Sequence, residues 1–154
     1  MTEFKFERLE VWQLSLEYLD LCYTLAERLP RQEEYNLKSQ VIRAATSITL
    51  NIAEGSTSQS NPEQGRFLNM AIRSLIETVA CRRLITRRGY LVQLPSSAES
   101  SSDSALLRTE QIGHELFAKL QSMRRVLLSD PRSAVRSQPS QSSNSGQRSP
   151  REKP

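Results

Sequence analysis

The sequence predicts an all-α protein: an antiparallel, up-down four-helix bundle followed by a disordered C-terminal tail. First, apolar residues recur at intervals of three and four positions in four segments of about 20 residues each, which is the spacing of a helix face. Second, the prolines of the first 130 residues, Pro30, Pro62 and Pro95, all fall between these segments. Third, only 6% of the residues are aromatic and five are glycine, which disfavours a turn-rich all-β fold. Helices of this length joined by short loops pack antiparallel.

The first predicted helix covers residues 8–29. Its apolar stripe comprises Leu9, Trp12, Leu16, Leu19, Tyr23 and Ala26. Further apolar residues beside the stripe, among them Val11 and Leu25, widen it. Pro30 ends the helix, because proline disfavours helical geometry in the residue before it.

The second predicted helix covers residues 34–54. Its stripe comprises Leu37, Val41, Ala44, Ile48 and Ile52. A strand is the alternative, because Ile48, Leu50 and Ile52 alternate with polar residues. We favour the helix because its pattern is longer and because Gly55 stands where a helix C-cap is expected.

The third predicted helix begins with Asn61 as N-cap and Pro62 in the first turn, and it runs to about Arg88, before Gly89. It carries two adjacent apolar stripes, which indicate a central helix or a subunit contact. The first stripe contains Phe67, Ala71, Ser74, Thr78, Cys81 and Ile85, and the second contains Leu68, Ile72, Leu75 and Val79.

The fourth predicted helix follows a serine-rich loop over residues 95–102. Ser102 or Asp103 is its expected cap, and it runs to about Ser129. Its stripe contains Leu106, Gly113, Leu116, Leu120, Met123 and Leu127. Gly113 is a weak point, costing about 1 kcal/mol relative to alanine inside a helix.

The sequence divides into a bundle domain, residues 1–130, and a tail, residues 131–154. The tail is rich in serine, proline and arginine and has no aromatic residue, so it is expected to be disordered. It contains five basic residues and one acidic residue, so it carries the whole net charge of +4 and the bundle domain is neutral. The basic isoelectric point therefore belongs to the tail.

The sequence offers no residues for catalysis, for a cofactor or for a metal site. Cys22 and Cys81 lie far apart in the sequence and are interpreted as small buried residues. His114 is the single histidine, and no nucleotide-binding or hydrolase motif occurs. We therefore expect a protein that is not an enzyme. The polar N-terminus and the lack of an apolar run of about 18 residues predict a cytoplasmic protein with no membrane contact.

The candidate nucleic-acid-binding residues are Arg82, Arg83, Arg87 and Arg88, at the end of the third helix. Arginine suits phosphate because its planar fork of donors matches the phosphate oxygens. The alternative is a solvated helix end, at which cations stabilise the macrodipole. The tail has two readings as well, an inert extension or a flexible arm that adds salt-sensitive affinity for RNA or DNA.

Three stretches occur together in a characteristic order. They are FERLEVWQ at residues 6–13, RAATSI leading into NIAEG at residues 43–55, and RFLNMA at residues 66–71 with Ser74, Leu75 and Glu77. RGYL follows at residues 88–91. With this combination the chain closely resembles the bacterial four-helix bundle family of proteins encoded in intervening sequences of 23S ribosomal RNA genes, a family related to the accessory variability proteins of diversity-generating retroelements.

The resemblance implies a bundle that assembles into a ring, typically a homopentamer, and no catalytic activity. For the retroelement relatives it implies binding to nucleic acid and to a reverse transcriptase through a basic surface. The chain departs from the family pattern at Thr49, where proline is frequent, and at Arg73, where glycine is frequent.

Within the NIAEG motif, Asn51, Glu54 and Gly55 read mainly as structural. Gly55 is expected to adopt a left-handed cap, and Asn51 and Glu54 to bond backbone groups or an arginine such as Arg43. Two functions remain open: a ring-forming nucleic-acid-binding or ribonucleoprotein accessory protein, and a protein-interaction scaffold with no nucleic-acid role.

Overall fold

The computed structural model describes residues 3–91 and 99–129, and of residues 99–104 it describes the backbone only. The helices, in chain order, are the 3₁₀ helix η1 (Lys5–Arg8), α1 (Glu10–Glu27), the 3₁₀ helix η2 (Arg31–Glu33), α2 (Leu37–Ser56), α3 (Asn61–Arg87) and α4 (Glu99–Ser129). The predicted disordered tail, residues 131–154, lies outside the described residues.

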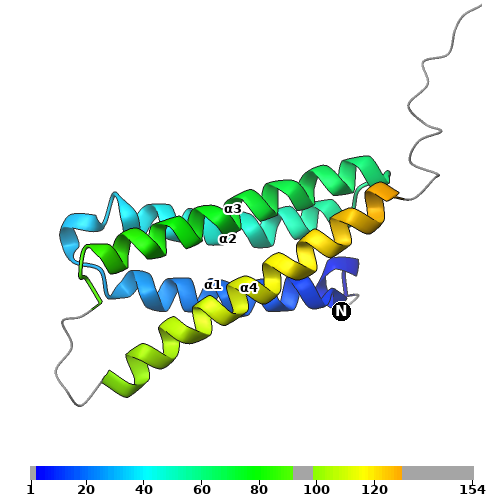
Figure 1. Cartoon of the computed structure of the whole chain (residues 1–154). Coiled ribbons are helices and arrows are strands. Elements are labelled where there is room, and N and C mark those ends of the chain that lie inside the picture. Colours follow the sequence, from blue (N-terminus) through cyan, green and yellow to red (C-terminus); the bar gives the residue numbers. More distant parts are fainter. Residues whose placement is uncertain (1–2, 92–98, 130–154) are drawn as a thin grey trace, which may run out of the picture.

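The four α-helices form an up-down bundle, as predicted (Figure 1). Each helix packs against the next one along the chain, and α4 packs back against α1. Helix α4 is inclined to the others, and its first turns lie away from the rest of the bundle (Figure 1). None of the described helices is long and apolar enough to cross a membrane.

Helix α1 buries a different stripe from the predicted one. Its buried residues are Val11, Ser15, Tyr18, Cys22, Leu25 and Ala26. Tyr23, which was placed on the predicted seam, is 44% exposed. Leucines of α1 lie on several sides of the helix, so the apolar pattern of its sequence did not identify the face that points into the core. Two polar residues are buried because their hydroxyls are satisfied: Ser15 donates to the Trp12 carbonyl (2.7 Å), and Tyr18 bonds Thr78 (2.8 Å).

Helix α2 buries the whole predicted stripe, from Leu37 to Ile52, which excludes the strand alternative. The helix runs unbroken through Thr49 to Ser56. The expected left-handed cap at Gly55 is wrong, because Gly89 is the one described residue with positive φ. Gly55 serves instead as a contact point, where a Cβ atom would lie 2.9 Å from the Cβ of Phe67 on α3.

Helix α3 packs against both α2 and α4, which explains its two apolar stripes. Ser60, one residue before the predicted cap, is the N-cap and accepts a hydrogen bond from the Glu63 backbone N–H. At the other end Gly89, with φ of 73°, allows the Gly89 and Tyr90 N–H groups to bond the carbonyls of Thr86 and Ile85. This is the Schellman arrangement, which needs a residue that tolerates positive φ.

Helix α4 begins at Glu99, before the expected caps Ser102 and Asp103. Residues 99–102 of the predicted loop are therefore helical, and residues 95–98 lie outside the described part. Leu116 and Leu120 are fully buried, and Met123 and Leu127 are half-buried against the core, as their stripe predicted.

The core runs along the bundle axis and contains both cysteines, which are unpaired. Burial raises the pKa of the Cys22 thiol to about 12. A smaller apolar cluster of Leu25, Leu29, Leu37 and Ile85 lies where α1 and α3 end, with Tyr90 packed against it. This second cluster fixes the end of the bundle that carries the candidate arginines.

Candidate nucleic-acid interface

The four candidate arginines occupy the last turns of α3, but their surroundings differ. Arg82 faces α4, where its Nη2 atom lies 3.0 Å from Oε1 of Glu110. Its side chain is only 14% exposed. The charge of Arg82 is thus compensated within the bundle, and this residue links α3 to α4.

Arg88, the C-cap residue of α3, is also engaged. Its Nε atom donates to the hydroxyl of Tyr90 at 3.3 Å, and its guanidinium carbon lies 5.8 Å from the centroid of the Tyr90 ring. The Tyr90 hydroxyl in turn donates to Oε1 of Glu33 at 2.7 Å. Arg88 is therefore one end of a polar network that joins η2 to the end of α3.

Glu33 is the centre of this network and is only 6% exposed. Besides the Tyr90 hydroxyl, it accepts bonds from the amide nitrogen of Asn36 (2.9 Å) and the backbone N–H of Leu37 (3.4 Å). The bond from Tyr90 is the main reason why the pKa of Glu33 lies below its ordinary value. Because Leu37 is the first residue of α2, Glu33 also satisfies an otherwise unpaired donor at that helix start.

Replacing Tyr90 with phenylalanine is expected to lower the free energy of unfolding at pH 7. A carboxylate with a lowered folded-state pKa stabilises the fold above its unfolded-state pKa, and this stabilisation is lost as the pH falls through the folded-state pKa. The difference between the native chain and Tyr90→Phe should therefore shrink below about pH 4. Urea unfolding at pH 7 and in acid measures it, with Tyr35→Phe as control because Tyr35 is 96% exposed. An equal difference at both pH values would show that the Tyr90–Glu33 bond does not stabilise the fold.

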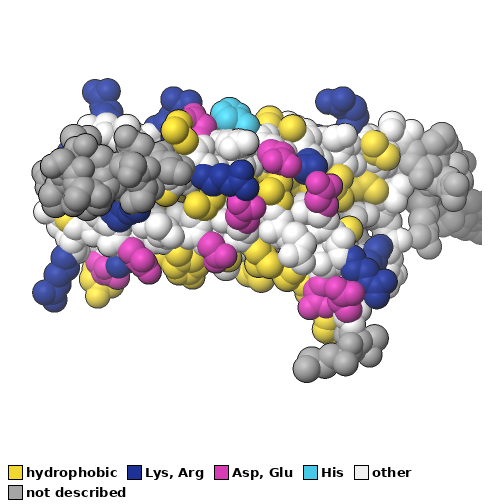
Figure 2. All heavy atoms as spheres, turned by 90° about the horizontal axis from the view of Figure 1, so that it is seen from below, with side chains coloured by type: hydrophobic (Ala, Val, Ile, Leu, Met, Phe, Trp, Pro, Cys, Tyr) yellow, Lys and Arg dark blue, Asp and Glu magenta, His cyan; other side chains and the backbone are white. Residues whose placement is uncertain are grey.

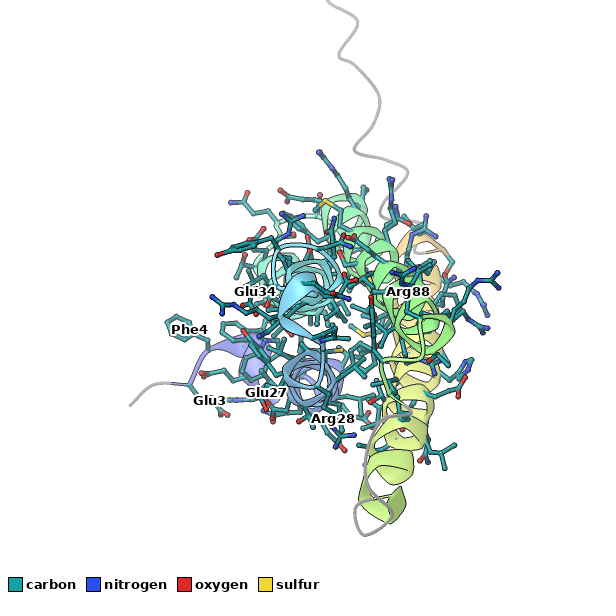
Figure 3. All side chains as sticks on the ribbon, turned by 90° about the vertical axis from the view of Figure 1, so that its left-hand side faces the viewer. Glu3, Phe4, Glu27, Arg28, Glu34 and Arg88 are labelled. Carbon is teal, nitrogen blue, oxygen red and sulfur yellow. The ribbon has the colours of Figure 1, made fainter. Side chains whose placement is uncertain are left out.

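Arg83 and Arg87 are exposed and, unlike Arg82 and Arg88, neither has a bonding partner among the described residues. They stand four positions apart, so they share one face of α3. Figure 3 looks on to this end of the bundle, where Arg28 and Arg88 lie among the acidic side chains of Glu27 and Glu34. The end is therefore of mixed charge, with Arg83 and Arg87 as its uncompensated cations on α3.

The NIAEG motif lies on α2, away from these arginines. The side-chain amide of Asn51 donates to the Ser47 carbonyl (2.7 Å) and hydroxyl (3.1 Å), and Ser74 of α3 donates to the same hydroxyl (2.9 Å). Asn51 thus supports the α2–α3 contact, whereas Arg43 bonds Gln40 rather than the motif. Glu54 is exposed and borders an open hollow of about 400 Å³ on the outer face of α2, together with Ile42, Arg43 and Leu50.

Charges on the face formed by α1 and α4 are paired across the two helices. Arg108 contacts Glu17 (2.6 Å), and Lys119 contacts Glu10 (2.8 Å). Figure 2 shows basic and acidic side chains intermixed over this face, with apolar atoms between them. The described residues of this face form no continuous basic surface for a phosphate backbone.

The arginine end of α3 and the end of α4 at Ser129 lie at opposite ends of the bundle (Figure 1). Gly65, near the start of α3, lies close to Leu128, where a Cβ atom would come within 3.3 Å of the Leu128 Cδ2 atom. The chain therefore passes into the predicted basic tail at the far end from Arg83 and Arg87.

Sequence reasoning missed the partners of Arg82 and Arg88. Glu110 lies 28 positions from Arg82, and Glu33, to which Arg88 is linked through Tyr90, lies 55 positions from Arg88, so no local pattern indicates these acidic residues. Within the described residues no group of three metal-ligating side chains comes together.

Comparison with protein families identifies a family that the chain matches. The sequence model of the family described as 23S rRNA-intervening sequence protein matches residues 7–116, more than two thirds of the chain. This range covers the end of η1, all of α1, η2, α2 and α3, and the first half of α4. No curated protein matches the chain.

Proposed function

This chain belongs to the 23S rRNA-intervening sequence protein family, and on that premise we propose that it is a non-enzymatic, ring-forming accessory protein that binds RNA or DNA through phosphate contacts. The observation that carries the proposal is the pair Arg83 and Arg87, two exposed arginines on one face of α3. Their guanidinium groups suit phosphate oxygens, and nothing around them reads base edges.

The salt dependence of such binding follows from the number of cations. Each neutralised phosphate releases counterions, which contributes a slope of about −0.9 to a plot of log affinity against log salt. Two arginines on the bundle give a slope of about −2. If the tail cations contribute as well, they add up to about −4.5 to this slope. The acidic side chains of Glu27 and Glu34 at the same end weaken the attraction.

The first experiment is a titration of RNA and DNA at two salt concentrations, with the full chain and with a chain ending at Asp130. Salt-dependent binding that survives truncation supports a site on the bundle. Binding that is lost with the tail would make the bundle a platform for basic arms. Failure of both forms to bind RNA or DNA would reject the proposal.

In the bundle domain, Arg83→Gln with Arg87→Gln should reduce nucleic-acid affinity about tenfold at low salt and bring the slope close to zero. The control is Arg66→Gln with Arg73→Gln, which removes two exposed arginines from the same helix. Equal losses in the two double variants would indicate a response to net charge rather than a site at the end of α3.

Self-association is the second part of the proposal, with a homopentamer as the expected form. Exposed apolar residues lie on two separate faces, Leu50 on α2 and Leu84 on α3. Two different faces are what a head-to-tail interface needs, and such interfaces close into rings when the rotation permits.

Native mass spectrometry should find five times the mass of one chain, and Leu50→Glu should produce smaller species. Leu50 is 55% exposed and borders the α2 hollow, so a carboxylate there would be desolvated in a contact. Tyr23→Glu, on the exposed side of α1, is the control. A chain that remains monomeric at high concentration would reject the ring.

A protein-interaction scaffold is the alternative function. The second apolar stripe of α3, which first suggested it, is largely buried in the core, but Leu84 and Leu107 are 50% and 68% exposed. A reverse transcriptase is the partner that the distant resemblance implies. Capture of proteins that withstands nuclease treatment, together with no direct binding of nucleic acid, would favour this alternative.

A further inference from the structure

A hollow of about 220 Å³ opens between α1, α3 and α4. Its inner wall is mostly apolar and includes Leu75, Val79 and the ring of Tyr18. The buried Thr109 also lines it, with its hydroxyl donating to the Ala105 carbonyl. At the mouth stand Ile76 and Phe117, which are 54% and 36% exposed. The hollow is therefore lined by exposed apolar side chains at its mouth and by apolar side chains of the core at its inner wall.

Gly113 explains why the hollow exists. A Cβ atom at this position would lie 3.2 Å from the Cε2 atom of Tyr18, which is closer than ordinary van der Waals contact. Glycine thus allows α4 to pass beside the Tyr18 ring and leaves one wall without a side chain. This position is unfavourable for helix formation, and the close approach to Tyr18 gives a physical reason for glycine there.

The rim of the hollow carries an excess of positive charge. Arg82 and Glu110 form their ion pair there, and Arg83 and His114 lie beside it. Because Glu110 compensates Arg82, the rim keeps the positive charge of Arg83. Arg83 is exposed and without a partner among the described residues, so its guanidinium is available to an anion.

We propose that this hollow binds a small organic anion whose flat apolar ring enters between α3 and α4 and whose carboxylate contacts Arg83. Pockets for drug-sized ligands measure roughly 300–1,000 Å³, so this smaller hollow suits one or two fused rings. A phosphate backbone does not fit the apolar wall, because its charges would lose hydration without partners. The carboxylate lies at the rim, where Arg83 offers a charge-assisted hydrogen bond.

The test compares two probes of the same shape, indole-3-acetate and its neutral analogue indole-3-acetamide, by protein-observed NMR titration of the full chain. For a ligand of about 13 non-hydrogen atoms we expect a Kd on the order of 1 mM or tighter. The acetate should bind about five- to tenfold more tightly than the amide. Shifted resonances should include Val79 and Gly113.

Two variants complete the test. Arg83→Gln should remove the preference for the acetate while leaving the amide affinity unchanged, whereas Arg66→Gln should change neither. Ile76→Trp, at the exposed mouth, should reduce the binding of both probes without affecting nucleic-acid affinity, because it removes no cation. Equal affinities of the two probes for the native chain would overturn the proposal. Probe binding that appears only when subunits dissociate would show that a second copy of the chain occupies the hollow. This result would also overturn the proposal.

Discussion

Replacing Thr78 with valine is expected to lower the free energy of unfolding by about 1–3 kcal/mol. The Thr78 hydroxyl donates its single hydrogen to the Leu75 carbonyl at 2.7 Å, so the Tyr18 hydroxyl must donate to Thr78 at 2.8 Å. Valine has almost the shape of threonine but removes the acceptor. The Tyr18 hydroxyl is then left buried with only the Cys22 sulfur, a weak acceptor, as its partner, and this cost is larger than that of losing a satisfied bond.

The asymmetry between the two residues provides the control. Tyr18→Phe leaves Thr78 with its bond to Leu75, so it should cost less than Thr78→Val, about 0.5–1.5 kcal/mol. The double variant has no orphaned hydroxyl and should be more stable than the sum of the single changes implies. Urea unfolding of the four proteins measures the coupling. Burial raises the pKa of Tyr18, so it stays a neutral donor at ordinary pH. Strictly additive changes in the free energy of unfolding would contradict the conclusion that the Tyr18 hydroxyl donates to Thr78.

Replacing Gly55 with alanine is expected to destabilise the protein by about 1–2 kcal/mol. The new Cβ atom would lie 2.9 Å from the Cβ of Phe67. Both atoms are bonded directly to backbone, so α2 and α3 have to move apart rather than a side chain rotate. Overpacking of this kind typically costs about 1–3 kcal/mol. The better helix propensity of alanine offsets up to about 1 kcal/mol of this cost.

Gly65→Ala is the matched control for Gly55→Ala. Its Cβ atom would lie 3.3 Å from Cδ2 of Leu128, a flexible side-chain tip near the end of α4. Because this tip can yield, we expect a change near zero or a small gain from helix propensity. Thermal and urea unfolding of the two variants measure the difference. Similar effects in both variants would show that helix propensity, rather than the close approach of α2 to α3, determines the change in stability.

Much of the bundle could be predicted because the spacing of apolar residues and the positions of the prolines indicated the same helices. Pro30 falls outside the α-helices, Pro62 falls in the first turn of α3, and the α2 stripe is buried as its spacing indicated. The burial of Tyr18 could not be predicted, since it depends on Thr78, 60 positions away. Likewise, a glycine near a helix end usually suggests a cap, but at Gly55 the approach of Phe67 is what requires it.

The candidate site was predictable as a cluster along the chain but not as a surface. The sequence places Arg82, Arg83, Arg87 and Arg88 together, whereas the fold turns Arg82 toward Glu110 and ties Arg88 through Tyr90 to Glu33. Which arginines remain exposed depends on the relative position of three helices. Asn51 and Gly55 lie at the α2–α3 contact, and the expected left-handed cap at Gly55 is not formed.

The arginine end of α3 and the end of α4 lie at opposite ends of the bundle, so a nucleic acid that contacts both must span its length. Helix α3, with 27 residues at 1.5 Å each, is about 40 Å long. One turn of a DNA duplex measures about 34–36 Å. Oligonucleotides much shorter than one turn can reach only one end of a subunit at a time. Affinity should therefore rise in a step, rather than smoothly, once the oligonucleotide exceeds about one helical turn.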